Sequence, residues 1–170
     1  MANTYTLISS VTVGSGGQSA IEFTSIPQTY TDLLIKTSIR SNRATVVADF
    51  IKLSFNGSSA NQSSMDLYGG GTASFSGTQS IIYGGLVSSG DATASVFSNG
   101  EIYIPNYTSS NNKPVSTDSV SENNGGESYV YLNAGLWSVG SAITSISITP
   151  NTGTLLNQHS TAYLYGISNA

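Results

Sequence analysis

The sequence is poor in the residues that most enzymes and nucleic-acid binders use. Its 170 residues include no cysteine and one histidine, and only 8% are charged, against about 25% in a typical soluble domain. Without cysteine there is no disulfide framework, no thiolate nucleophile and no Cys-ligated zinc. Five basic residues and a net charge of −4 argue against binding to nucleic acid, because too few cations are present to neutralise a phosphate backbone.

The sequence also lacks long apolar runs. None approaches the roughly 20 residues of a membrane-spanning helix, so we expect no membrane partner. Residues 1–5 contain neither a basic segment nor an apolar one, so we expect no signal peptide and synthesis in a cytoplasm. The length predicts a single domain, residues 1–170. A chain of this length can bury a core without metals or disulfides, and we expect no cofactor.

What the sequence does contain is apolar alternation with a period of two, which predicts strands with one buried face. In 31–40, Leu33 and Ile35 alternate with Leu34 and Lys36, and 48–55 repeats the pattern. The remaining predicted strands are 5–13, 19–24, 79–87, 92–97, 101–104, 115–121, 128–132, 142–149 and 162–167. Because the first and last strands lie at the two ends of the chain, we expect the termini to be neighbours or at least tied into sheets.

Glycine and asparagine mark the predicted turns, since both tolerate the positive φ of tight hairpins. The turns are predicted at 14–17, 56–57, 69–71, 89–91, 99–100, 123–126 and 151–153. Residues 61–76 and 105–114 are predicted as the long loops. Short strands at this spacing, with almost no helical periodicity, are typical of an all-β antiparallel sandwich, jelly-roll-like in its connections.

Candidate catalytic and metal-binding residues are few and scattered. His159 has no carboxylate near it in sequence, and we interpret it as a surface or loop-anchoring residue. Asp118, Glu122, Asn123 and Asn124 could offer oxygens to a cation, as could Asp91 with Glu101, but solvated turn residues are the favoured interpretation. Glu22 and Asp32 are interpreted as loop charges. A glycosidase pair is allowed by the spacing, but no coherent acid–base cluster supports it, and we predict a protein that is not an enzyme.

The basic residues Lys36, Arg40 and Arg43 lie close together, with Asp49 following. One interpretation is an internal network of ion pairs and hydrogen bonds between adjacent strands. The other, equally weighted, is that Arg40 and Arg43 anchor an acidic partner surface.

Ten tyrosines and Trp137 form the other notable set. Tyrosine is enriched at protein interfaces, where its ring is apolar and its hydroxyl can bind. Alternation places Tyr129 and Tyr131 on one face of their strand. We predict Tyr103, Tyr107, Tyr129 and Tyr131 as partner-binding residues, and Trp137 as a core residue.

Several segments together resemble small virion structural proteins of tailed bacteriophages, particularly marine ones. They are IPQTYTDL (26–33), RSNR (40–43) before IKLSFNG (51–57), GEIYIPNY (100–107), AGLW (134–137) and STAYLYGI (160–167). The resemblance covers most of the chain, and these motifs are architectural, so it assigns no site residue. It implies a β-sandwich on the outside of the particle.

The function expected from this resemblance is that of a head decoration, or cement, protein. Its partner would be the major capsid protein, it would form a homo-oligomer, with a trimer favoured by analogy, and it would be made in the bacterial host cytoplasm. The alternative is a tail-fibre-associated or carbohydrate-binding virion protein that uses the four tyrosines as its platform.

Overall fold

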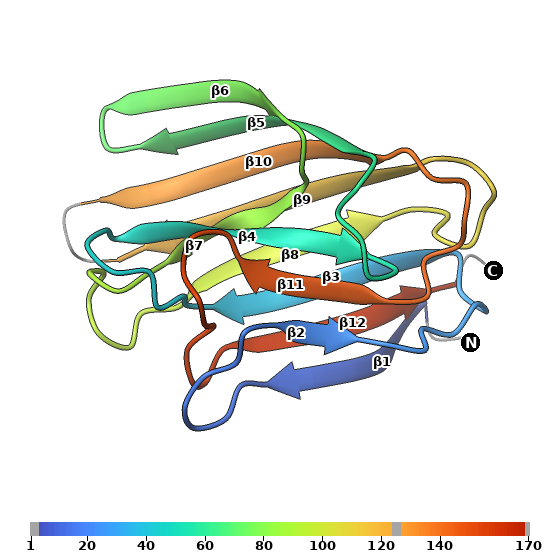
Figure 1. Cartoon of the computed structure of the whole chain (residues 1–170), viewed down its shortest axis with the longest axis horizontal. Coiled ribbons are helices and arrows are strands. Elements are labelled where there is room, and N and C mark those ends of the chain that lie inside the picture. Colours follow the sequence, from blue (N-terminus) through green and yellow to red (C-terminus); the bar gives the residue numbers. More distant parts are fainter. Residues whose placement is uncertain (1–3, 124–126, 169–170) are drawn as a thin grey trace.

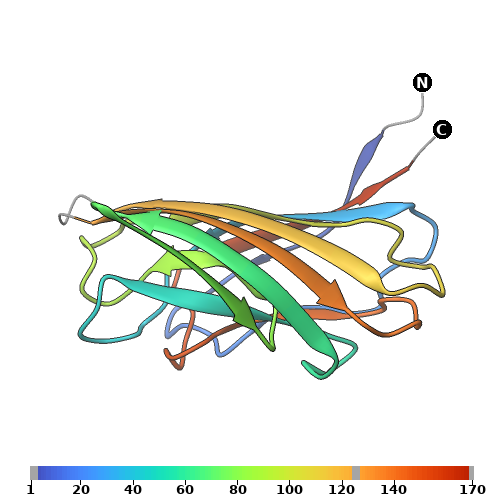
Figure 2. The ribbon, with the colours of Figure 1, turned by 90° about the horizontal axis from the view of Figure 1, so that it is seen from above.

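The computed structural model describes residues 4–123 and 127–168, and these form an all-β sandwich of two antiparallel sheets. Figure 2 shows the two layers edge-on, with the larger sheet above the smaller one. The described residues include no helix long and apolar enough to cross a membrane. The two packed antiparallel sheets confirm the predicted sandwich, whereas its jelly-roll connectivity stays a prediction.

The larger sheet has eight strands in the order β1-β12-β3-β8-β9-β10-β5-β6. Their bounds are β1 Tyr5–Thr12, β3 Asp32–Ile39, β5 Gln62–Gly70, β6 Ala73–Gln79, β8 Ser98–Ile104, β9 Lys113–Glu122, β10 Ser128–Trp137 and β12 Thr161–Ile167. Figure 1 shows β1 and β6 at opposite edges and the two termini close together. The pairing of β1 with β12 confirms that the ends of the chain are neighbours in one sheet.

The smaller sheet has four strands in the order β2-β11-β4-β7. Their bounds are β2 Ile21–Phe23, β4 Ala48–Phe55, β7 Tyr83–Ser88 and β11 Ile146–Pro150. This sheet covers the middle of the larger one and leaves β5 and β6 extending beyond it (Figure 1). No second layer of described residues covers the outer face of the eight-stranded sheet (Figure 2).

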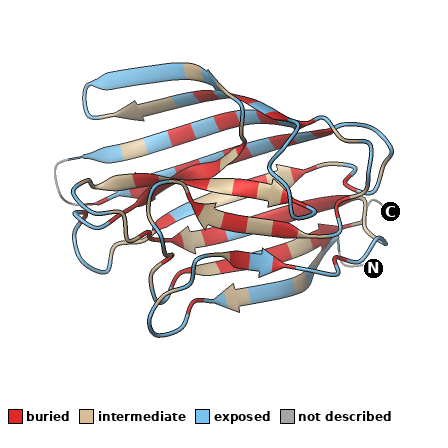
Figure 3. Ribbon diagram, in the orientation of Figure 1, coloured by how far each residue is buried: buried red, intermediate tan, exposed pale blue. Residues whose placement is uncertain are grey.

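The core lies between the sheets and is built by the predicted alternation. Ile35 of β3, Leu53 of β4 and Ile102 of β8 are fully buried, while their chain neighbours point the other way. Figure 3 shows this as alternating buried and exposed stripes along the strands. Trp137 is buried against Phe55 in this core, as predicted. Burying side chains of this size contributes about 1.5–3 kcal/mol each to folding.

Three local predictions were wrong. Residues 61–76, predicted as a loop, form β5 and part of β6. Residues 92–97, predicted as a strand, form irregular turns before β8. Asn99-Gly100 lies inside β8 and not in a turn, because the sheet packs tightly at Gly100: a Cβ there would come within 3.0 Å of the Asp118 carbonyl oxygen and 3.1 Å of Thr37 Oγ1.

The other predicted turns and loops correspond to the connections between strands, with small shifts in their bounds. The loop predicted over 105–114 ends at Lys113, where β9 begins. Of the turn predicted at 123–126, residues 124–126 lie outside the described residues.

Candidate functional site: the outer face of the eight-stranded sheet

Arg40, predicted as a partner-binding residue, is instead a structural residue. It is only 7% exposed, and its guanidinium donates four hydrogen bonds to backbone carbonyls. The acceptors are Thr93 at 2.7 Å, Val96 at 3.0 Å, Gly90 at 3.3 Å and Ala92 at 2.8 Å. Arg40 therefore holds the 90–96 segment against the end of β3, and both terminal nitrogens of its guanidinium are engaged within the protein.

Arg43 also belongs to an internal network, although it is half-buried. Its Nη1 lies 3.7 Å from Oδ1 of the buried Asp49, which also accepts hydrogen bonds from the backbone of Thr152 and Gly153. The sequence left two interpretations of these arginines open, an internal network and contact with an acidic partner. The structure places both Arg40 and Arg43 in an internal network of ion pairs and hydrogen bonds. Of the two, Arg43 keeps the larger exposed surface.

Two of the four predicted tyrosines are buried, so their assignment as binding residues was wrong. Tyr107 is fully buried and its hydroxyl donates to the carbonyl of Pro27. Tyr131 is also fully buried, donates to Asp66 Oδ1 at 2.8 Å, and points to the inner face. Burial, reinforced by the hydrogen bond to Asp66, raises the pKa of Tyr131 far above its ordinary value. Both phenols act as interior hydrogen-bond donors.

The other two tyrosines keep some accessible surface. Tyr103 lies on the outer face of β8, and its hydroxyl donates to Asp32 Oδ2 at 2.8 Å; Asp32 is thus a buried acceptor rather than a loop charge. Tyr129 lies at the start of β10 beside Glu127, which accepts a hydrogen bond from its hydroxyl. Burial and that carboxylate raise the pKa of Tyr129 to about 12. The predicted tyrosine platform is therefore not assembled.

The outer face also carries an exposed apolar cluster that was not predicted from the sequence, which we call the apolar patch. Its six residues are between 36% and 59% exposed. They are Met65 and Leu67 of β5, Val120 of β9, and Val130, Leu132 and Leu136 of β10. Strand register places Leu67 opposite Leu132 and Val120 opposite Val130. The sequence of β10 contains a signal for this patch, because large apolar or aromatic residues occupy both faces of the strand. Val130, Leu132 and Leu136 lie on one face, and Tyr131 and Trp137 lie on the other.

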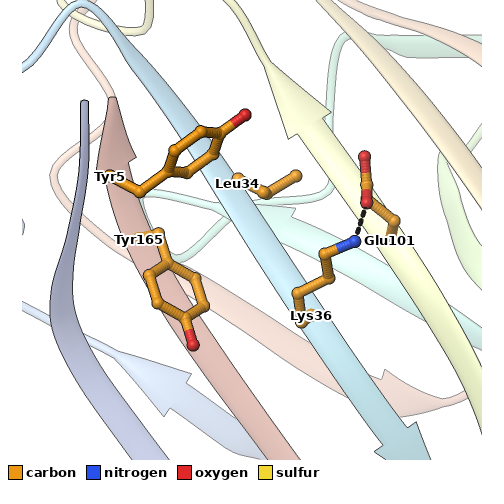
Figure 4. Close-up of a pocket in the computed structure, with 5 residues that line it drawn as sticks. All are labelled: Tyr5, Leu34, Lys36, Glu101 and Tyr165. Atoms are coloured by element: carbon orange, nitrogen blue, oxygen red, sulfur yellow. Dashed lines mark hydrogen bonds and ion pairs between the residues drawn. The ribbon is translucent and has the colours of Figure 1, made fainter. Parts of the chain in front are cut away.

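The opposite end of the same face carries a second exposed cluster, which we call the tyrosine groove. It is a shallow hollow of about 380 Å³ lined by Tyr5, Leu34, Lys36, Glu101 and Tyr165. Figure 4 shows the two tyrosines on one side of Leu34 and the Lys36–Glu101 ion pair on the other. Leu34 is buried at this point although it lies on the outer face. The groove combines aromatic rings with one cation and one anion.

A short charged strip extends from the tyrosine groove to the apolar patch. Lys36 of β3 pairs with Glu101 of β8, and Glu101 lies opposite Asp118 of β9. Asp118 in turn lies opposite Leu132 of the apolar patch. The pKa of Asp118 is raised, first by desolvation and then by the nearby Glu101, against the opposing effect of Lys36. The three charged side chains of this row thus lie side by side on β3, β8 and β9.

Replacing Asp118 with asparagine should increase stability slightly at pH 7. The folded protein raises the pKa of this carboxyl above 3.8, so stability falls as the pH rises through that pKa and the carboxyl ionises. We expect Asp118→Asn to raise the free energy of unfolding at pH 7 by less than about 1 kcal/mol, since the site is exposed. At pH 3 the gain should vanish, because the carboxyl is already protonated. Urea unfolding at both pH values tests this, and a loss of stability at pH 7 would contradict it.

The remaining sequence candidates are not brought together. Glu101 is in register with Asp118, whereas Asp91 lies in the irregular segment after β7. Across residues 4–123 and 127–168, no group of three or more His, Cys, Asp or Glu side chains could hold a metal ion. His159 is exposed in the loop before β12, where its backbone N–H donates to the Val13 carbonyl at 2.9 Å. This agrees with its interpretation as a surface or loop-anchoring residue.

No family model, curated protein sequence or solved structure matches this chain.

Proposed function

We propose that this protein is a non-enzymatic structural protein that docks on a larger protein assembly through the outer face of its eight-stranded sheet. The resemblance to virion structural proteins of tailed bacteriophages makes that assembly the capsid, and the partner the major capsid protein. In this role the protein decorates the assembled head and stabilises it. It would be present on the capsid exterior after synthesis in the host cytoplasm.

The observation that carries the proposal is the apolar patch. Six exposed apolar side chains from three adjacent strands form one cluster, and contiguous exposed apolar patches of this kind mark interaction sites. Interface cores are also depleted of charge, and the hollow that Met65, Leu67 and Leu132 line has Asp118 as its one charged residue. The charged strip of Lys36, Glu101 and Asp118 supplies polar groups at one margin of the patch, where an interface is typically polar and solvent-accessible.

The docking surface differs from the one expected from sequence. Arg40, Tyr107 and Tyr131 are buried, so they contribute to it only by supporting the fold. Binding through leucine, valine and methionine side chains depends little on ionic strength, because salt screens charges and leaves apolar burial in place. A charge-poor surface of this kind suits a partner that offers many equivalent sites.

The tyrosine groove favours a second candidate function, binding of a carbohydrate by a tail-associated virion protein. Tyr5 and Tyr165 offer aromatic faces, and Lys36 and Glu101 offer a donor and an acceptor for hydroxyl groups. Titration of the protein with host polysaccharides, followed by tyrosine fluorescence, tests this candidate. A response that Tyr165→Ala removes would support it, and a flat response to the whole panel would count against it.

The copy number in purified virions distinguishes the two functions. Quantitative mass spectrometry should find copies in proportion to the major capsid protein if this protein decorates the head. A far lower count, in the range of a tail component, would favour receptor binding. Absence from purified particles would overturn both virion functions.

Adding the protein to capsids that lack it should raise their melting temperature. A ligand that binds only the folded assembly stabilises it by about 2.7 kcal/mol when its concentration is a hundred times Kd. Differential scanning calorimetry of capsids with and without saturating protein measures the shift. An unmoved capsid transition at saturation would contradict a stabilising role.

A further inference from the structure

The two sheets have four edge strands, and three of them have features that hinder the addition of another strand. The β1–β12 register is interrupted by a bulge between Leu7 and Ser9. β2 is only three residues long, and the pairing of β7 with β4 shifts between Ile51 and Lys52. Bulges and short strands are devices by which natural proteins protect sheet edges.

The fourth edge, β6, has none of these devices. Its seven residues pair with β5 in one unbroken register, and they include no proline and no charged residue. Figure 3 shows the strand largely exposed at the margin of the molecule. Every second residue of an edge strand directs its backbone N–H and C=O away from the sheet. β6 therefore presents a regular row of backbone groups that another strand can bind.

We propose that β6 pairs antiparallel with β6 of a second copy of this chain, about a two-fold axis at Ser76. This interface is independent of the proposed function and uses a different surface. In the resulting register, Phe75 lies opposite Gly77 of the partner subunit, and Ser74 lies opposite Thr78 of the partner subunit. A two-fold interface is self-complementary, so each such contact occurs twice.

The side chains of β6 fit this register on the inner side of the sheet. Phe75 is 51% exposed and stacks on Tyr68 with ring centroids 5.0 Å apart. Tyr68 in turn packs against Phe50 of β4, and Phe50 contacts the fully buried Tyr131, so an aromatic row that begins in the interior ends at the open edge. The space above Gly77 is open, since a Cβ there would meet only Gln79 Nε2, at 3.8 Å. The Phe75 ring can cover the glycine opposite it, as aromatic side chains do for glycines in sheets.

The charge distribution also favours a second copy as the occupant. β6 carries no charge, so two β6 strands meet without repulsion although each chain has a net charge of −4. On the outer side, Ser74 opposite Thr78 of the partner subunit is a hydroxyl pair of the kind that stabilises adjacent strands. The two-fold axis is perpendicular to the sheet, so both apolar patches would lie on the same side of one continuous sheet.

Mass measurement of the purified full chain is the first test. Sedimentation equilibrium from low micromolar to submillimolar concentration should give twice the monomer mass of 17.6 kDa. Ser76→Lys should weaken the association at least about tenfold, because it sets two like charges opposite each other. Ser10→Lys, on the other edge strand β1, is the matched control and should leave the association unchanged. Mixing Ser76→Lys with Ser76→Glu should restore it.

A disulfide test checks the register independently of any effect on folding. The chain has no cysteine, and facing Cα atoms in antiparallel strands are about 4.5–5.5 Å apart, within the range that a disulfide spans. Ser76→Cys should cross-link with itself under oxidation. Ser74→Cys should cross-link only when mixed with Thr78→Cys.

Three outcomes of the mass measurements would overturn the proposal. They are a monomer at every concentration, a mass of three chains, or dissociation by Ser10→Lys as readily as by Ser76→Lys. The last result would indicate head-to-tail pairing of β6 with β1. Equal cross-linking of Ser74→Cys and Ser76→Cys alone would also exclude the stated register.

Discussion

Replacing Arg40 with leucine is expected to lower the free energy of unfolding by about 3–5 kcal/mol. The guanidinium donates to four carbonyls of the 90–96 segment, and a leucine would leave those acceptors without their donors. Hydrogen bonds to a charged group contribute about 1.5–3 kcal/mol each when made, and they are not additive within one group. Urea unfolding measures the loss, and limited proteolysis should show faster cleavage within 90–96.

Lys36→Leu is the matched control for Arg40→Leu. Lys36 lies in β3, four residues before Arg40, and forms an exposed ion pair with Glu101. An exposed pair is worth about 0–1 kcal/mol, so this variant should stay close to the wild-type stability. Arg40→Lys should recover only part of the loss, because one ammonium group cannot reach acceptors arranged for a planar fork. Equal stability of Arg40→Leu and Lys36→Leu would show that the buried network contributes little.

Replacing Leu67 and Leu132 together with serine should weaken binding to the capsid at least about a hundredfold. The two side chains face each other at the centre of the apolar patch, and each contributes about 1.5–3 kcal/mol if binding buries it fully. Both are close to half exposed in the free protein, so the free energy of unfolding should change far less than the affinity. Co-sedimentation of the variant with capsids measures the affinity.

The Leu7→Ser variant tests whether capsids bind to the apolar patch or to the tyrosine groove. Leu7 and Leu67 are both 52% exposed on the outer face, but Leu7 lies on β1, beside Tyr165 of the groove. If the apolar patch is the docking surface, Leu7→Ser should bind capsids as the wild type does. Normal binding by the Leu67→Ser/Leu132→Ser variant would instead remove the patch from the proposed interface.

The wrong predictions for β5 and for the segment 92–97 have physical causes. β5 was missed because its polarity is inverted: Met65 and Leu67 face solvent, whereas Asp66 faces the interior. The interior accepts Asp66 because Tyr131 and Asn133 donate hydrogen bonds to it, and both donors come from β10. The segment 92–97 has apolar residues at strand spacing, but three of its carbonyls accept hydrogen bonds from the Arg40 side chain and not from a neighbouring strand.

Local sequence determined the all-β class, most strand positions and the glycine and asparagine turns, because alternation and positive φ depend on residues next to one another. It did not determine which face of a strand is buried. Tyr129, Tyr131 and Leu132 illustrate this: alternation separates Leu132 from the two tyrosines, but only the packing of the four-stranded sheet turns the tyrosines inward and leaves Leu132 outside. Sheet pairing likewise decided that six apolar side chains from three strands meet on one face. Such contacts join residues far apart in the chain, and their free energy depends on which surfaces the second sheet covers and which it leaves in water.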